Sequence, residues 1–235
     1  MQARVVIGAN RTFGLKNAVL LYRDGTSMFA TLHSVIMRGK SGAPYLGPGQ
    51  ALTTAFLRTL AEGLGARIAA EILPEKVVAR TPDMITWWTP PVREVMFFGG
   101  ADPEARALDG GTYPHPALVF KVTHRELFVR ALERDMRPAA ETLLKTAPYW
   151  NCDAAGRVCL GSMRIPDETS VESIAGWQAG FFRSQFTHPN GAVRLTTHPG
   201  GFISLWKSLK NSQLPFPIEF LTDAKETLRQ FVERD

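Results

Sequence analysis

The most informative stretch of this sequence is P-Y-W-N-C-D-A-A-G-R-V-C-L-G, residues Pro148–Gly161. It places Asn151 eight residues before Cys159, and Gly156 three residues before that cysteine. If the backbone doubles back over residues 153–156, the Asn151 amide lies near the Cys159 thiol. A thiolate can hold an acyl group, and a side-chain amide can donate a hydrogen bond to the oxyanion of acyl transfer. The segment therefore predicts acyl-transfer chemistry at Cys159.

Short apolar or β-branched runs precede this segment, and Pro, Asp and Gly residues separate them. The connections are of hairpin length and leave no room for crossover helices, which favours an antiparallel meander. The stretch Gly99–Pro116 is predicted to be a loop. The five predicted strands are Val77–Ala79, Met84–Trp88, Val92–Phe98, Ala117–Val122 and Leu127–Ala131.

Helical periodicity occurs in three places. Apolar residues at steps of four predict a helix over Leu52–Leu64, with glycines near its end. A second helix is predicted over about residues 170–186, where the Asp167-Glu168-Thr169-Ser170 composition opens an aromatic stripe. A last helix is predicted over Asp223–Val232. Together with the meander, these helices indicate the α+β class.

The N-terminal fifty residues have a different character. Two apolar runs, Ala18–Tyr22 and Met28–His33, flank an Asp-Gly turn signal and predict a β-hairpin. The Gly- and Pro-rich stretch Gly39–Gly49 is predicted to be a loop or subdomain boundary.

Asn151–Leu160, N-x4-G-x-V-C-L in outline, resembles the active-site signature of the ubiquitin-conjugating (E2) superfamily, in which an H-P-N triplet precedes the acceptor cysteine. The order of helix, antiparallel meander, cysteine segment and helix is similar to that of an E2 core. Thr112–Pro116 is similar to a shortened E2 Y-P-x-x-P-P element. The resemblance implies an E2/UBC-like catalytic domain over residues 49–235, with a β-rich extension over residues 1–48.

The motifs A-P-Y-W-N, G-R-V-C-L-G-S-M and F-T-H-P-N are similar, more narrowly, to the prokaryotic E2-like family that includes PRTRC system protein B. This resemblance implies an E1/ThiF-like adenylating partner, a ubiquitin-like protein and a JAB-type peptidase in the same cassette. It implies that Cys159 accepts the ubiquitin-like protein as a thioester and passes it to a target nucleophile. Such cassettes are associated with antiphage defence or mobile-element maintenance, and the sequence leaves both open.

The chain departs from the E2 pattern at the first two positions of the triplet, which are Tyr149 and Trp150. A literal H-P-N occurs at residues 188–190, after the cysteine, in the loop that in E2 proteins folds back beside it. His188 is therefore a candidate proton acceptor or a helix-end residue. Asn151 is a candidate for stabilising the oxyanion or for bracing the turn.

Two other readings remain open for the same residues. The missing histidine favours a non-catalytic E2 variant that binds a ubiquitin-like protein or scaffolds its cassette, in which Cys159 is structural. Alternatively, Cys159 and His188 are the nucleophile and base of a cysteine hydrolase.

Cys152 and Cys159 are the two cysteines, too few for a disulfide framework or a four-cysteine zinc site. Their C-x6-C spacing is not that of a zinc half-site, and the histidines have no ligand-like spacing. We expect free thiols, a packing role for Cys152, no metal and no cofactor.

The composition excludes several classes of protein. The 235 residues are 45% hydrophobic and 21% charged, which is typical of a globular chain. The net charge of +5 comes from dispersed residues rather than blocks, so we do not expect a nucleic-acid partner. No apolar run reaches the roughly 18 residues of a membrane span, and the N-terminal residues lack the apolar segment of a signal peptide. We expect a cytoplasmic protein with no membrane partner.

Overall fold

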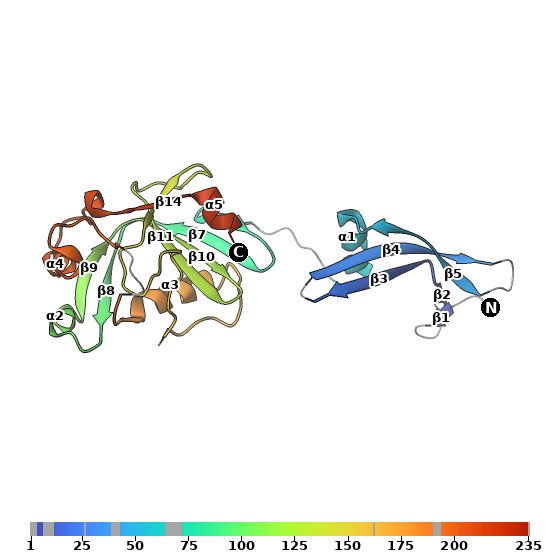
Figure 1. Cartoon of the computed structure of the whole chain (residues 1–235), viewed down its shortest axis with the longest axis horizontal. Helices are drawn as coiled ribbons and strands as arrows, with labels where there is room; N and C mark the ends of the chain where they lie inside the picture. Colours follow the sequence, from blue (N-terminus) through green and yellow to red (C-terminus); the bar gives the residue numbers. More distant parts are fainter. Residues whose placement is uncertain are drawn as a thin grey trace. The chain divides into compact units, whose positions relative to one another are not determined.

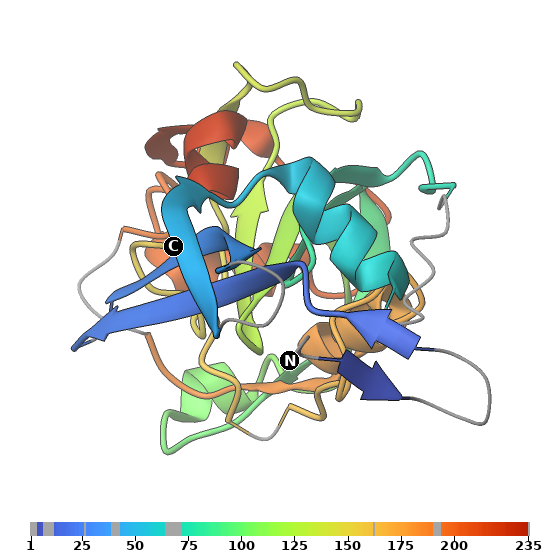
Figure 2. The same cartoon turned by 90° about the vertical axis from the view of Figure 1, so that its right-hand side faces the viewer.

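The computed structural model describes residues 4–6, 12–25, 27–38, 43–63, 72–161, 163–189 and 194–234. They form two compact units, residues 1–71 and residues 72–235, whose elements are labelled in Figure 1. The observed boundary differs from the expected one at residue 48. Helix α1 (Thr54–Gly63) lies in the first unit and begins two residues after strand β5 (Pro44–Ala51) ends (Figure 2).

The N-terminal unit is built on a three-stranded antiparallel sheet in the order β3-β4-β5. Strands β3 (Asn17–Asp24) and β4 (Ser27–Met37) form the predicted hairpin, with Asp24 opposite Ser27. A two-stranded sheet pairs β1 (Arg4–Val6) with β2 (Thr12–Gly14).

The prediction of a loop over Gly39–Gly49 was wrong for its second half. Residues 44–51 form β5, which pairs with β4 from Met37 to Thr31. An edge strand tolerates proline and glycine, because its outer backbone groups need no partner. The first part of this stretch, residues 39–42, lies outside the described residues.

A six-stranded antiparallel sheet forms the centre of the second unit, in the order β14-β12-β11-β10-β7-β6. The antiparallel arrangement agrees with the prediction. Its strands are β6 (Val77–Arg80), β7 (Met84–Thr89), β10 (Leu118–Thr123), β11 (Glu126–Ala131), β12 (Leu143–Thr146) and β14 (Asp223–Thr227).

One predicted strand leaves this sheet. Residues 92–98 form β8 (Val92–Phe98), which pairs with β9 (Gly111–His115) and with the short β13 (Gln185–Phe186). Strand β7 therefore pairs directly with β10. Pro90 and Pro91 cannot donate ladder hydrogen bonds, which separates β8 from the end of β7. The predicted loop Gly99–Pro116 was wrong in part, since it contains β9 and the short helix α2 (Pro103–Arg106).

Helices cover both faces of the central sheet. All six residues of β10 are buried, as expected for a strand covered on both sides. Phe120 packs against Phe181 of α3 (Ile174–Arg183) on one face. Val119, on the other face, shares a core with Phe231 of α5 (Leu228–Glu233). The other helical segments are α4 (Gly201–Leu209) and the 3-10 turn η1 (Ile218–Phe220).

Two helix predictions need correction. The helix predicted over residues 170–186 is confined to α3, and residues 185–186 form β13. The helix predicted over Asp223–Val232 begins only at Leu228, because residues 223–227 form the edge strand β14. Thr227 and Gln230 make a capping box at this start. The helix predicted over Leu52–Leu64 agrees with α1 as far as Gly63, and Leu64 lies outside the described residues.

Candidate functional site

The cysteine segment doubles back as its sequence predicts. The Cys159 N–H donates to the Asn151 carbonyl at 2.8 Å, and Asp153 N–H donates to the Arg157 carbonyl at 3.0 Å. Gly156 closes the turn through a 2.9 Å bond from its N–H to the Asp153 carbonyl. Its φ of +79° is a conformation that favours glycine. The backbone therefore brings Asn151 and Cys159 together.

Strand β11 holds the returning arm of this turn. The Val129 N–H donates to the Gly156 carbonyl, and the Val158 N–H donates to the Leu127 carbonyl, both at 2.8 Å. Residues 156–158 thus pair antiparallel with residues 127–129 of β11, just before Cys159. The sheet fixes the backbone on which the thiol is carried.

The two cysteines have opposite environments. Cys159 is exposed and Cys152 is buried. Burial raises the pKa of the Cys152 thiol from 9.0 to about 12, so this thiol stays protonated at neutral pH. The packing role expected for Cys152 agrees with its place in the core.

We predict that iodoacetamide at pH 8 modifies Cys159 and not Cys152 in the folded protein. The thiolate is the reactive form, and Cys152 is both inaccessible and protonated. Intact mass should show a single adduct, which the Cys159→Ala variant lacks. A second adduct should follow denaturation, and its presence in the native protein would contradict the burial of Cys152.

Asn151 joins the cysteine segment to the chain after α3. Its side chain is buried, and Nδ2 donates to the Gln185 carbonyl at 2.8 Å. Its own carbonyl accepts the Cys159 N–H. One residue thus connects β13 with the backbone of the cysteine.

Cys159 lies between two hollows. One, of about 230 Å³, is lined by Asn151, Cys159 and His188, the three residues singled out from the sequence. The exposed His188 ring forms a 2.8 Å hydrogen bond through Nδ1 with Thr187 Oγ1. The second hollow, of about 550 Å³, has a charged lining made by Arg125, Glu126, Asp153 and Arg157. No motif in the sequence indicated this second hollow, because its charged lining comes from two separate segments of the chain.

Most of this chain matches one known protein family. The family model Prokaryotic E2 family D matches residues 55–224, which is more than half of the chain. The chain belongs to this family. The match includes the cysteine segment and the His188 loop, and it confirms the prediction of a prokaryotic E2-like protein. No curated protein and no solved structure matches the chain. Family membership indicates a role in ubiquitin-like conjugation.

The residue at the first triplet position of this family D protein belongs to its core. Tyr149 is fully buried, and its Oη shares a 2.9 Å hydrogen bond with Nδ1 of His115. Burial lowers the pKa of His115 from 6.5 to about 3, and the positive charge of Arg93 acts in the same direction. His115 is therefore neutral near pH 7 and has a structural role.

We predict that His115 makes the protein less stable as the pH falls below 6.5. In that range His115 binds a proton in the unfolded chain but stays neutral in the folded protein. The free energy of unfolding therefore decreases as pH falls toward 3. Between pH 7 and pH 5 the loss is about 2 kcal/mol. Urea unfolding of the native protein and His115→Gln at both pH values measures it. Equal losses in both proteins would contradict the prediction.

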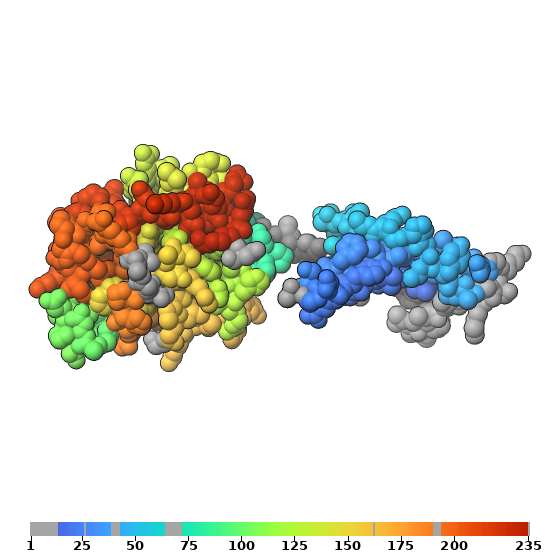
Figure 3. Space-filling view, in the orientation of Figure 1, coloured from blue at the N-terminus to red at the C-terminus, as the bar shows by residue number. Residues whose placement is uncertain are grey.

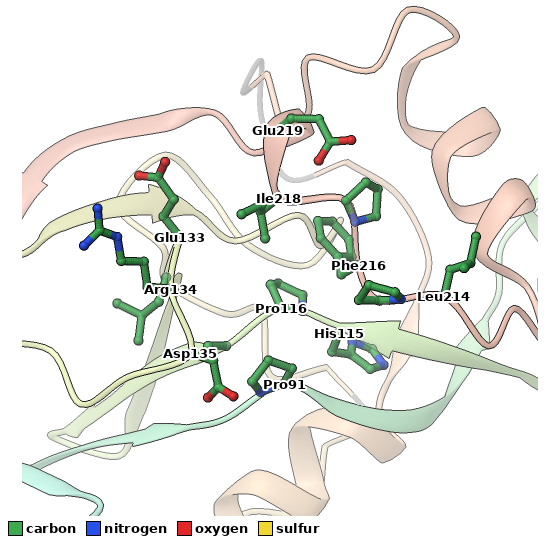
Figure 4. A pocket seen from close by; sticks show the side chains of 14 residues that line it. Pro91, His115, Pro116, Glu133, Arg134, Asp135, Leu214, Phe216, Ile218 and Glu219 are labelled. Atoms are coloured by element: carbon green, nitrogen blue, oxygen red, sulfur yellow. The ribbon is translucent and has the colours of Figure 1, made fainter.

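A larger hollow of this E2 family D protein lies away from the thiol. It has a volume of about 570 Å³, and prolines and Phe216 make much of its surface (Figure 4). Glu133, Arg134 and Asp135 lie along one side. Cys159, Asn151 and His188 are not among its lining residues. This hollow is therefore separate from the candidate site around Cys159.

Within the described residues, no group of three or more His, Cys, Asp and Glu side chains could hold a metal ion. No helix in the same parts of the chain is long and apolar enough to cross a membrane.

Proposed function

We propose that this E2 family D protein carries a ubiquitin-like protein as a thioester on Cys159. The single observation that carries the proposal is the exposed Cys159 thiol, held on a fixed backbone in a hollow shared with Asn151 and His188. An E1/ThiF-like partner supplies the activated modifier, and a target nucleophile receives it. We expect the E1/ThiF-like partner and the target to bind this protein in the cytoplasm.

The chemistry consists of two acyl transfers. The Cys159 thiolate attacks the thioester carbonyl on the E1-like protein, the new S–C bond forms, and the partner's thiolate leaves. An amine of the target then attacks the Cys159 thioester, and the Cys159 thiolate leaves as the amide forms. The ATP spent by the E1-like protein supplies the energy. This protein contributes positioning and charge stabilisation, and it requires no cofactor.

The two hollows beside Cys159 support this sequence of steps. A thioester needs room for the acyl chain on one side of the sulfur and for the incoming nucleophile on another. We assign the nucleophile to the hollow that contains His188, and the extended end of the modifier to the charged hollow beside Arg157. His188 accepts the proton that the amine loses.

Asn151 acts as a brace in this proposal. Its side-chain amide donates to the Gln185 carbonyl while its backbone carbonyl accepts from Cys159. Because the side-chain amide already has an acceptor, this arrangement favours a bracing role for Asn151 over an oxyanion-donor role in the protein that carries no modifier. The same bond keeps β13, and with it the His188 loop, beside the cysteine.

The test is an ATP-dependent charging assay with the neighbouring E1/ThiF-like and ubiquitin-like proteins. We expect an adduct that disappears with reductant. Discharge of the preformed adduct to free lysine should be slower in His188→Ala, by about tenfold or more for a lost general base. Unchanged discharge in His188→Ala would remove His188 from the mechanism without affecting the assignment of Cys159.

A non-catalytic binding module is the second candidate. The core position of Tyr149 favours it, because this chain has no histidine at the first triplet position. Binding of the ubiquitin-like protein without charging by a demonstrably active E1-like protein would support it. Hydrolysis of a peptide ester without any E1 would instead support a cysteine hydrolase.

The narrower relation to PRTRC system protein B is also a proposal. It places a JAB-type peptidase in the same cassette and a role in antiphage defence or mobile-element maintenance. Loss of one of these phenotypes in a Cys159→Ala strain would distinguish them.

A further inference from the structure

Three charged side chains form a hydrogen-bonded group beside the turn that leads to Cys159. Glu226 of β14 accepts a hydrogen bond from Arg130 Nε through one carboxylate oxygen. Its other oxygen accepts from Arg234 Nη1 at 2.8 Å. Arg234 directly follows α5, and Arg130 lies in β11. One carboxylate thus holds two guanidinium groups from different elements.

Each guanidinium also donates to the turn itself. Arg130 Nη2 donates to the Ala154 carbonyl at 2.8 Å, and Arg234 Nη2 donates to the Ala155 carbonyl at 2.5 Å. These two carbonyls belong to consecutive residues at the tip of the turn. Hydrogen bonds from charged donors are stronger than those between neutral groups, so both peptide planes are held firmly. In Figure 3 the red surface of residues 223–234 borders the yellow surface of the region that includes this turn.

The burial of the three side chains makes this arrangement specific. The side chain of Arg130 is 2% exposed, that of Glu226 12% and that of Arg234 32%. A buried charge that loses its partner is costly, so the group tolerates few alternative geometries. Arg234 is further fixed because its backbone carbonyl accepts a hydrogen bond from the buried Lys121.

The turn has little freedom of its own to compensate. A Cβ on Gly156 would lie 2.6 Å from the Val129 carbonyl and 3.0 Å from Arg130 Nη1. The glycine therefore packs directly against β11 and Arg130. Movement of the Arg130 guanidinium would alter the contact that sets the return of the chain toward Cys159.

We propose that Glu226, Arg130 and Arg234 are positioning residues that hold the Ala154 and Ala155 carbonyls and thereby keep Cys159 opposite Asn151. The consequence for charging rests on the proposed function, whereas the order of the turn does not. Glu226 of β14 and Arg234 after α5 thus act on a turn that ends at Cys159, about 70 residues earlier in the chain.

The test compares Arg234→Ala with the matched control Arg229→Ala. Both arginines belong to the α5 region and form ion pairs, but Arg229 pairs with the exposed Glu141 and Glu233. Hydrogen exchange measures the amides of Asp153, Gly156 and Cys159, which are bonded within the segment. We expect exchange in residues 153–159 to be about tenfold faster in Arg234→Ala, the effect of one lost charged hydrogen bond. In Arg229→Ala, exchange of residues 153–159 should match that of the native protein. Exchange of β10 should match it in both variants.

A merely structural role would accelerate exchange across the whole unit, and that outcome would overturn the proposal. Unchanged exchange of residues 153–159 in Arg234→Ala would overturn it as well. If Arg234→Ala does not fold, Arg234→Lys serves the same purpose, because one ammonium replaces the guanidinium fork that spans Glu226 and Ala155. For Arg234→Lys too, faster exchange across the whole unit or unchanged exchange of residues 153–159 would overturn the proposal.

Charging kinetics provide the functional measurement. In Arg234→Ala we expect the rate at saturating E1-like protein to fall about tenfold, with an unchanged KM for that partner. A raised KM with an unchanged maximal rate would contradict a positioning role. If the native protein itself never charges, the proposed function fails, while the exchange experiment still decides whether these residues order the turn.

Discussion

Replacement of Cys159 by alanine should abolish the thioester adduct, with charging reduced about a hundredfold or more relative to the native protein. Alanine has no nucleophilic atom, and the other thiol, Cys152, is buried with its pKa raised to about 12. Cys159→Ser should give either no adduct or an oxygen ester that resists reductant. Gels with and without reductant distinguish these products.

Cys152→Ala is the matched control, because it removes the other thiol of the same segment. We expect it to charge like the native protein at temperatures where it remains folded. An adduct that persists in Cys159→Ala and disappears in Cys152→Ala would contradict the assignment of the acceptor. Failure of the native protein to charge with active partners would favour the binding-module alternative.

Gly156→Ala should have the largest effect on stability among substitutions in the turn. The new methyl group would lie 2.6 Å from the Val129 carbonyl, and φ of +79° is unfavourable for alanine. Because backbone atoms form the clash, side-chain rotation cannot relieve it. We expect the free energy of unfolding to fall by about 2–4 kcal/mol.

Urea unfolding followed by tryptophan fluorescence measures this change. All five tryptophans lie between residues 87 and 206, so their fluorescence reports on the C-terminal unit. Gly110→Ala is the control: its φ is +67°, but nothing lies within 4 Å of the added atom. It should cost about 1 kcal/mol, from the backbone alone. Equal losses in the two variants would show that the contact with Val129 is unimportant.

Local patterns predicted the local structure well. The Asp-Gly signal between two apolar runs predicted the β3–β4 hairpin, and the step of four predicted α1. The glycine three residues before Cys159 predicted the turn that returns to Asn151. In each case the decisive interactions join residues close together in the chain, so sequence spacing carries the information.

The errors occurred where local signals competed with distant partners. Proline and glycine in residues 44–49 indicated a loop, but these residues pair with β4 and form an edge strand. Apolar spacing over 223–232 indicated one helix, but pairing with β12 extends residues 223–227. The Thr227 and Gln230 capping box was a signal in the sequence for the later helix start.

The primary structure was sufficient to identify the family and the spacing that returns the chain from Cys159 to Asn151, because these depend on motifs within short segments. Folding alone exposed Cys159 and buried Cys152, joined Asn151 to Gln185, and paired Tyr149 with His115. It also joined Glu226 to Arg130 across 96 positions of the chain. Burial and long-range hydrogen bonds depend on which distant segments pack together, and no local pattern of residues encodes that packing.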